Sequence, residues 1–89
     1  MRAVITVIGK DAVGILAKVT GICADAGVNV MDVSQTIMQD LFAMTMLADI
    51  SGLEQEFGAF SDRLKALGES MNLQIHVMHE DIFGAMHRI

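Results

Sequence analysis

The sequence has few of the residues that form cross-links, linkers or nucleic-acid contacts. Its single cysteine, Cys23, cannot form an internal disulfide or a zinc thiolate cluster, which agrees with a reducing compartment. Proline, tryptophan and tyrosine are absent, which excludes proline-rich linkers and the commonest base-stacking side chains other than phenylalanine. Only six lysines and arginines oppose eleven aspartates and glutamates, for a net charge of −5. This balance argues against direct binding to nucleic acid, whose phosphates need clustered positive charge.

Long apolar runs are missing as well. No stretch reaches the ~18 apolar residues of a membrane span, and Met1-Arg2-Ala3-Val4 lacks the features of a signal peptide, so we expect a cytoplasmic protein without a membrane partner. Apolar residues are nevertheless plentiful, at 53% of 89 residues. A single domain of this size hides only about 63% of its chain surface as a monomer. We therefore expect the surplus to form a subunit interface or a ligand pocket.

The first half of the chain predicts a strand, a helix and a second strand. Arg2 to Ile8 is an almost unbroken β-branched run, typical of a central strand buried on both faces. The next strand is predicted from Val28 to Met38, and its alternation changes phase, which indicates a bulge near Val30 or an edge position. Between the strands, Gly27 ends a predicted helix whose apolar face is Ile15, Leu16, Val19, Ile22, Cys23 and Ala26.

The second half repeats this order. Gln39-Asp40 predicts a hairpin turn before a strand over residues 41–50, and Ser51-Gly52-Leu53-Glu54 matches a capping box at the start of a second helix. Asn72 can end this helix, although Gly68 could end it earlier. Its apolar face is Leu53, Phe57, Phe60, Leu64, Leu67 and Met71. Apolar residues alternate with polar ones at Leu73, Ile75 and Val77, which predicts a half-buried last strand. In the tail, apolar residues recur at helical spacing.

The order β-α-β-β-α-β predicts an α+β fold of the ferredoxin-like kind, a four-stranded antiparallel sheet with two helices on one face. Residues 1–79 would form the domain, and residues 80–89 a short C-terminal helical tail that packs on the domain or its partner. The other face of the sheet and the edge of the second strand would stay uncovered. We therefore expect a homodimer or a higher homo-oligomer.

The most informative stretch is the first loop, from Lys10 to Leu16. Its flanking glycines and Asp11 let the backbone turn sharply and aim free amides outward, where the helix dipole attracts a carboxylate. The alternative is structural: Asp11 is an ordinary N-cap, and Gly14 allows close packing of helix and sheet.

A second segment, Ala26-Gly27-Val28-Asn29-Val30, places the polar residue Asn29 at the start of a strand made mostly of valine and methionine. The β-α-β topology is expected to bring the start of this strand to the same end of the sheet as the first loop. The amide of Asn29 can donate to a carboxylate and accept from an ammonium group. A local turn contact is the alternative.

The strand followed by Gly-Lys-Asp-Ala-Val-Gly-Ile-Leu-Ala-Lys-Val, and then Ala-Gly-Val-Asn-Val and the second half, resembles the ACT domain over residues 2–79. Residues 81–89 resemble the tail of small stand-alone ACT proteins of uncharacterised function. The resemblance implies a non-enzymatic regulatory module that binds an amino acid or similar metabolite between two copies and signals to a partner protein. Val13 stands where the family often has proline. The ligand contacts implied are Lys10, Asp11, Ala12, Val13, Gly14 and Ile15, with Asn29 and Val30 from a neighbouring copy.

Other chemistry has weaker support in the sequence. His76 and His79 are three apart on a strand and so point to opposite faces, which prevents them from binding one metal ion together. Cys23 lies on an apolar helix face, as a buried and inert thiol would. We expect no cofactor. Acylphosphatase-like catalysis would need an arginine in the first loop, which offers Lys10 instead. A structural subunit without a ligand is the remaining alternative.

Overall fold

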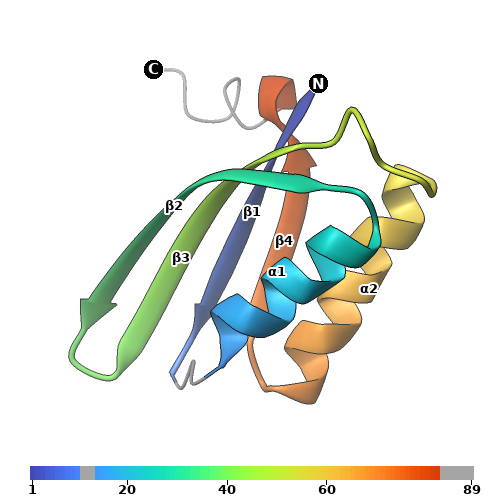
Figure 1. Cartoon of the computed structure of the whole chain (residues 1–89). Helices are drawn as coiled ribbons and strands as arrows, with labels where there is room; N and C mark the ends of the chain where they lie inside the picture. Colours follow the sequence, from blue (N-terminus) through green and yellow to red (C-terminus); the bar gives the residue numbers. More distant parts are fainter. Residues whose placement is uncertain (11–13, 83–89) are drawn as a thin grey trace.

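The structure is a computed structural model that describes residues 1–10 and 14–82. The elements are β1 (Arg2–Gly9), α1 (Ile15–Asp25), β2 (Asn29–Met38), β3 (Leu41–Asp49), α2 (Phe57–Ser70) and β4 (Gln74–His79). The strands form one antiparallel sheet in the order β2-β3-β1-β4. Both helices lie on the same face of this sheet (Figure 1). The predicted ferredoxin-like fold is confirmed.

β1 is a central strand, as its β-branched sequence predicts. Its odd-numbered residues Ala3, Ile5 and Val7 face the helices and are fully buried. On the opposite face Val4 is buried, but Ile8 is 43% exposed. On this second face burial is therefore correct at Val4 and wrong at Ile8.

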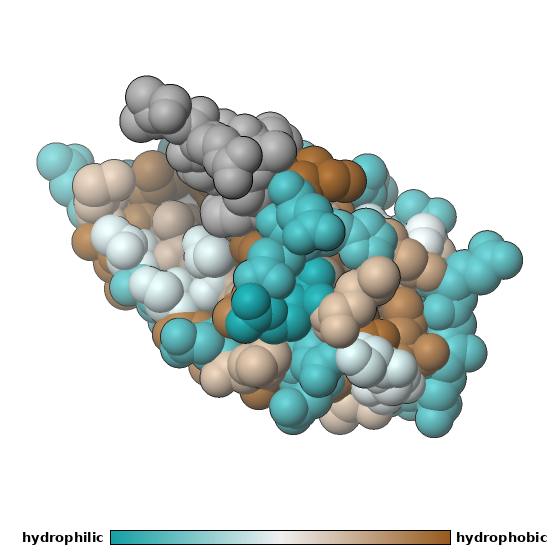
Figure 2. All heavy atoms as spheres, turned by 90° about the horizontal axis from the view of Figure 1, so that it is seen from above, coloured by the Kyte–Doolittle hydropathy of each residue, from teal (hydrophilic) through white to brown (hydrophobic). Residues whose placement is uncertain are grey.

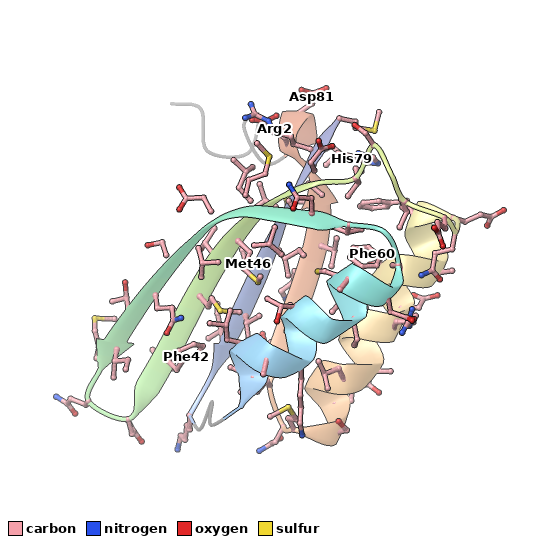
Figure 3. The ribbon with its side chains drawn as sticks, viewed as in Figure 1. Arg2, Phe42, Met46, Phe60, His79 and Asp81 are labelled. Atoms are coloured by element: carbon pink, nitrogen blue, oxygen red, sulfur yellow. The ribbon has the colours of Figure 1, made fainter. Side chains whose placement is uncertain are left out.

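The core lies between the sheet and the two helices. Met46 of β3 and Phe60 of α2 both belong to this core and are fully buried (Figure 3). α1 contributes Ile15, Val19 and Cys23, whereas Leu16 is 37% exposed at the edge of the apolar face. Among the described residues the core contains no polar or charged side chain. The fold is thus stabilised by burial of apolar surface.

Gly27 ends α1, as predicted. Its φ of +80° lies in the left-handed region, and a Cβ there would stand 2.4 Å from the backbone oxygen of Gly52. The amide of Glu54 donates to the backbone oxygen of Ala26 at 3.1 Å, so the loop before α2 packs directly against this corner. A side chain at Gly27 would separate the two loops.

β2 is an edge strand and carries the bulge that its phase change predicts. The register with β3 shifts between Val30 and Asp32. The hairpin to β3 turns at Gln39, whose φ is +55°. No residue of β2 is buried, and the β2–β3 hairpin extends away from the two helices (Figure 1).

The predicted capping box is wrong. α2 begins at Phe57, and its N-cap is Glu56, which makes no side-chain capping bond among the described residues. Ser51 is used elsewhere, since its Oγ accepts a hydrogen bond from the Met1 amino group at 3.1 Å. Its own amide donates to Asp49 Oδ1 at 2.9 Å. These contacts, together with the packing of Glu54 on Ala26, hold residues 51–54 in a turn.

α2 ends where the sequence predicts. Met71 is its C-cap, and Asn72 follows with a left-handed φ of +58°. Leu73 then donates its amide to the Gly68 oxygen at 2.8 Å, which directs the chain into β4. Residues 80–82 form a single helical turn, and the rest of the predicted tail lies outside the described residues.

Candidate functional site

The candidate site begins with the backbone amides in the first turn of α1. Gly14 is the N-cap, and no side-chain hydrogen bond caps the helix among the described residues. The Gly14 oxygen accepts from Lys18 at 3.1 Å, which closes the first turn. The amides of Ile15 and the two residues after it have no acceptor inside the helix. Such a helix start favours an anionic group, and a carboxylate is one.

The structural alternative for this loop is wrong in both parts. The N-cap is Gly14 rather than Asp11. A Cβ at Gly14 would meet nothing within 4 Å, so this glycine does not permit close packing of helix on sheet. Its φ of +77° explains the residue type instead, because other residues adopt this conformation at a cost.

The remaining first-loop candidates divide into three groups. Lys10 is exposed, and its Nζ lies 4.0 Å from Asp40 Oδ2. The side chain of Ile15 is 1% exposed and belongs to the core, so only its backbone amide can reach a ligand. The other candidates, Asp11, Ala12 and Val13, lie outside the described residues.

Asn29 and Val30 do not lie at the same end of the sheet as the first loop, and this expectation is wrong. Asn29 pairs with Asp49, which pairs with Arg2 at the start of β1, whereas Gly9 at the end of β1 pairs with Phe42. Figure 3 shows Arg2 and Phe42 at opposite ends of the sheet. Seven residue steps along β1 correspond to roughly 23 Å. The topology requires this separation, since α1 carries the chain back along the sheet before β2 begins.

The Asn29 end of the molecule is polar. Hydrogen bonds from the side chain and backbone of Ser51 lower the pKa of Asp49. Arg2 forms two hydrogen bonds with the carboxylate of Glu80, one of them 2.8 Å long. Figure 2 shows this end of the molecule with many hydrophilic residues among hydrophobic ones. Asn29 itself is exposed.

A hollow of about 490 Å³ lies at the other end of the molecule, beside Lys10. Its lining combines apolar side chains with two amides, and it joins the end of β1 to the turn before β4: Ile8, Gly9, Lys10, Met71, Asn72, Leu73 and Gln74. A second hollow of about 470 Å³ lies at the Arg2 end, where Arg2 is paired with Glu80. Both hollows are open to solvent, and neither is lined by both Lys10 and Asn29.

The histidines and the cysteine form no reactive cluster in the described part of the chain. His79 stacks on Phe57 with ring centroids 4.2 Å apart, while His76 pairs with Thr6 on the opposite face of the sheet. Within residues 1–10 and 14–82 no three His, Cys, Asp or Glu side chains gather as a metal site would require. Burial raises the pKa of Cys23 to about 11, which keeps the thiol neutral at physiological pH.

The family follows from this fold together with the sequence. A family model described as ACT domain matches residues 2–78. The chain belongs to the ACT domain family. ACT domains are typically regulatory modules that bind small ligands, and they commonly oligomerise. The resemblance seen in the sequence is thereby confirmed.

Relatives and solved structures agree with this assignment. The ACT chain is 48% identical over 89 residues to a UPF0237 protein of Listeria innocua, with 100% of both chains covered. It is 47% identical over 88 residues to a UPF0237 protein of Methanocaldococcus jannaschii, covering 99% of this chain and 98% of the other. An ACT domain protein from Streptococcus pneumoniae has a TM-score of 0.80 and 37% identity, with 93% of each chain covered.

More distant structures share the fold alone. A formyltetrahydrofolate deformylase from Pseudomonas syringae superposes with a TM-score of 0.77 at 20% identity, covering 88% of the ACT chain and 27% of the deformylase. Neither helix of the described residues is long and apolar enough to span a bilayer.

Proposed function

We propose that this ACT protein is a non-enzymatic regulatory module that binds an amino acid or a similar small carboxylate between two copies of the chain. The observation that carries the proposal is the start of α1. Among the described residues no side chain caps this helix, and a Cβ at Gly14 would meet nothing within 4 Å, in a family whose members typically bind small ligands. The carboxylate would accept hydrogen bonds from these amides. Lys10, Asp11, Ala12 and Val13 complete this half of the site.

The second half of the site would come from a neighbouring copy. One chain holds the first loop and Asn29 at opposite ends of its sheet. If two β2 edges pair antiparallel, the Asn29 end of one copy lies level with the first loop of the other. Asn29 and Val30 of the neighbour would then face the amides of α1, and the Asn29 amide could bind the polar groups of the ligand.

The two sheet edges differ in a way that favours pairing through β2. β2 carries exposed apolar side chains such as Met31, Ile37 and Met38, and it has no buried residue. Such an edge is a template for another strand. At the β4 edge, by contrast, a shallow hollow is lined partly by the charged side chains of Lys65 and Glu69. Charged side chains beside an edge discourage pairing.

Binding can be measured by thermal shift and calorimetry with a panel of free amino acids and simple carboxylates. Asn29→Ala should weaken the best ligand by ~1–3 kcal/mol and leave the melting temperature without ligand unchanged, because it removes polar partners and little packing. Gln55→Ala is the matched control, since it removes a side-chain amide from the loop before α2. No binding by any member of the panel would contradict the proposed function and favour a structural subunit.

A further inference from the structure

The face of the sheet opposite the helices is buried unevenly. Side chains on this face form rows across β3, β1 and β4, because directly paired residues point to the same side. In one row Val4 is only 5% exposed, and its partners Leu47 and Met78 are half-buried. Two rows further along, Ile8 of the same strand is 43% exposed. We call the row of Leu47, Val4 and Met78 the Val4 patch.

The sheet and the helices do not account for the burial of the Val4 patch. Both helices lie on the other side of the sheet (Figure 1). Neighbouring strands flank a side chain but leave its outer end open, and in the next row Thr45 and His76 are exposed. Leu47 and Met78 are longer side chains than threonine, yet they are less exposed. The Val4 patch is therefore covered from outside the sheet, close to the start of β1.

The chain that follows β4 is held on this same side of the sheet. Glu80, the first residue after β4, forms two hydrogen bonds with Arg2, of which the Nε–Oε2 bond is 2.8 Å long. Arg2 lies two positions from Val4 on one strand, so the two side chains share a face. Figure 3 shows Arg2 and Asp81 at the same end of the sheet. The helical turn of residues 80–82 is thereby anchored at the start of β1.

Seven residues follow Ile82 in the sequence, and their apolar side chains suit the Val4 patch. Phe83, Met86 and Ile89 are spaced by three, which is the spacing of one helical face. Seven residues span about 10 Å as a helix and up to roughly 24 Å when extended. Val4 lies only about 7 Å along β1 from the anchor at Arg2. The segment is therefore long enough to reach the patch in either conformation.

The charge of this segment also fits the surface around the patch. Asp32 pairs with Leu47 and so stands in the same row, and Asp49 pairs with Arg2 in the row before it. Residues 83–89 contain Arg88 and no aspartate or glutamate, although the whole chain has a net charge of −5. A segment without acidic side chains avoids repulsion by these two carboxylates.

We propose that residues 83–89 are an intramolecular cover for the Val4 patch, on which Phe83 and Met86 pack. Burial of apolar surface drives this contact. The Arg2–Glu80 pair holds the start of the segment beside the patch, so the segment of the same chain is present there at a high effective concentration. The cover protects the first half of β1 from solvent on this face and leaves the half that contains Ile8 open.

NMR of the wild-type protein with labelled methyl groups tests the contact directly. Nuclear Overhauser contacts are expected from the Phe83 ring and the Met86 methyl group to the Val4 patch, and none to Ile8. In an equal mixture of labelled and unlabelled chains, a spectrum that selects contacts between chains should show none of them. The absence of every contact from residues 83–89 to the patch would overturn the proposal. Contacts that appear only between chains would also overturn it, in favour of the same segment of a neighbouring copy.

Phe83→Ser provides a second measurement. It should shift the methyl signals of Val4 and Leu47, leave those of Ile8 in place and lower the melting temperature by ~4–8 °C. Met38→Ser is the control, since it removes an exposed apolar side chain at the far end of the sheet and should change none of these readouts. A Phe83→Ser protein that is folded by circular dichroism and keeps the wild-type Val4 and Leu47 signals would contradict the cover.

Discussion

At Gly14 the backbone angle, rather than the space around the residue, limits which side chains fit. The φ of +77° costs alanine ~1–2 kcal/mol, although its Cβ would meet no neighbour within 4 Å. Gly14→Ala should therefore lower the free energy of unfolding in urea by about that amount. Gly14→Asn should lower it less, because asparagine tolerates this conformation. Its side chain would also occupy the space before the free amides, so the ligand-induced thermal shift should disappear.

Gly21→Ala provides the control for Gly14. Gly21 also has no neighbour within 4 Å of a Cβ, but it lies inside α1. Alanine there should raise stability by up to ~1 kcal/mol through helix propensity and leave the ligand shift intact. If Gly14→Ala proved as stable as Gly21→Ala, the left-handed start of α1 would be contradicted.

Cys23 should make stability depend on pH at the alkaline end. Burial raises its pKa from 9.0 to about 11 in the folded chain, so the folded state favours the neutral thiol. This contribution is fully present below pH 9 and is lost as the pH rises from 9 to 11. The free energy of unfolding should fall by roughly 2–3 kcal/mol over this window.

Urea titrations from pH 8 to pH 11 measure this effect. Cys23→Ala serves as the reference, since it is expected to be less stable at every pH but to lack the thiol-dependent slope. Equal slopes for the two proteins would show that Cys23 is not the group responsible.

For the secondary-structure elements, the start of α2 offers a stabilising substitution. Glu56 has the extended backbone of an N-cap, with φ −63° and ψ 144°, yet its side chain makes no capping bond within the described part of the chain. Serine at this position can accept a hydrogen bond from a free amide of the first turn. Glu56→Ser should therefore raise the free energy of unfolding by ~1 kcal/mol, as measured by urea denaturation.

The capping box expected from the sequence can be tested by a second substitution, Glu54→Ala. If Ser51 and Glu54 formed a capping box, Glu54→Ala would cost ~1 kcal/mol. In the structure Glu54 contributes its backbone amide to Ala26, and an alanine keeps that amide. The side-chain change should stay within about 0.5 kcal/mol.

Elements were predictable where local chemistry alone determines them. β1 follows from its β-branched residues, Gly27 and Asn72 both adopt the left-handed conformation expected after a helix, and the bulge follows from the phase change at Val30. The helix start at Phe57 was not predictable locally. Its position depends on contacts between residues 51–54 and Met1, Ala26 and Gly27, which lie far away in the sequence.

At the scale of the whole molecule, the unpaired β2 edge predicts self-association. Ile37 is 70% exposed on this strand, and lysine there would add the charge that natural edge strands use against pairing. Ile37→Lys should prevent the pairing of two chains through β2. The mass measured by light scattering should therefore fall by the contribution of the paired copy, and ligand binding should be lost. The monomer should remain folded, since Ile37 contributes little to the core. A variant that still binds ligand with wild-type affinity would contradict a site shared across β2.

The site could be predicted in part. The sequence proposes Gly14 and Asn29 as site residues, and the structure places Gly14 at the N-cap of α1. The expectation that both lie at one end of the sheet is wrong, because a helix between two parallel strands returns the chain to the opposite end before the second strand begins. How two chains pair depends on surfaces such as the β2 edge, whose exposure is known only from the fold.

The central position of β1 means that one of its edges stays unpaired while the rest of the chain is being synthesised. β1 lies between β3 and β4, and residues 10–73 separate its end from the start of β4. At a synthesis rate of ~5–20 residues per second, these 64 residues take roughly 3–13 s to emerge from the ribosome. During that interval one side of the most β-branched strand in the chain has no partner. A nascent chain that stalls before β4 would expose this edge of β1 to other chains. Pairing of β4 with β1 therefore protects the new protein from aggregation.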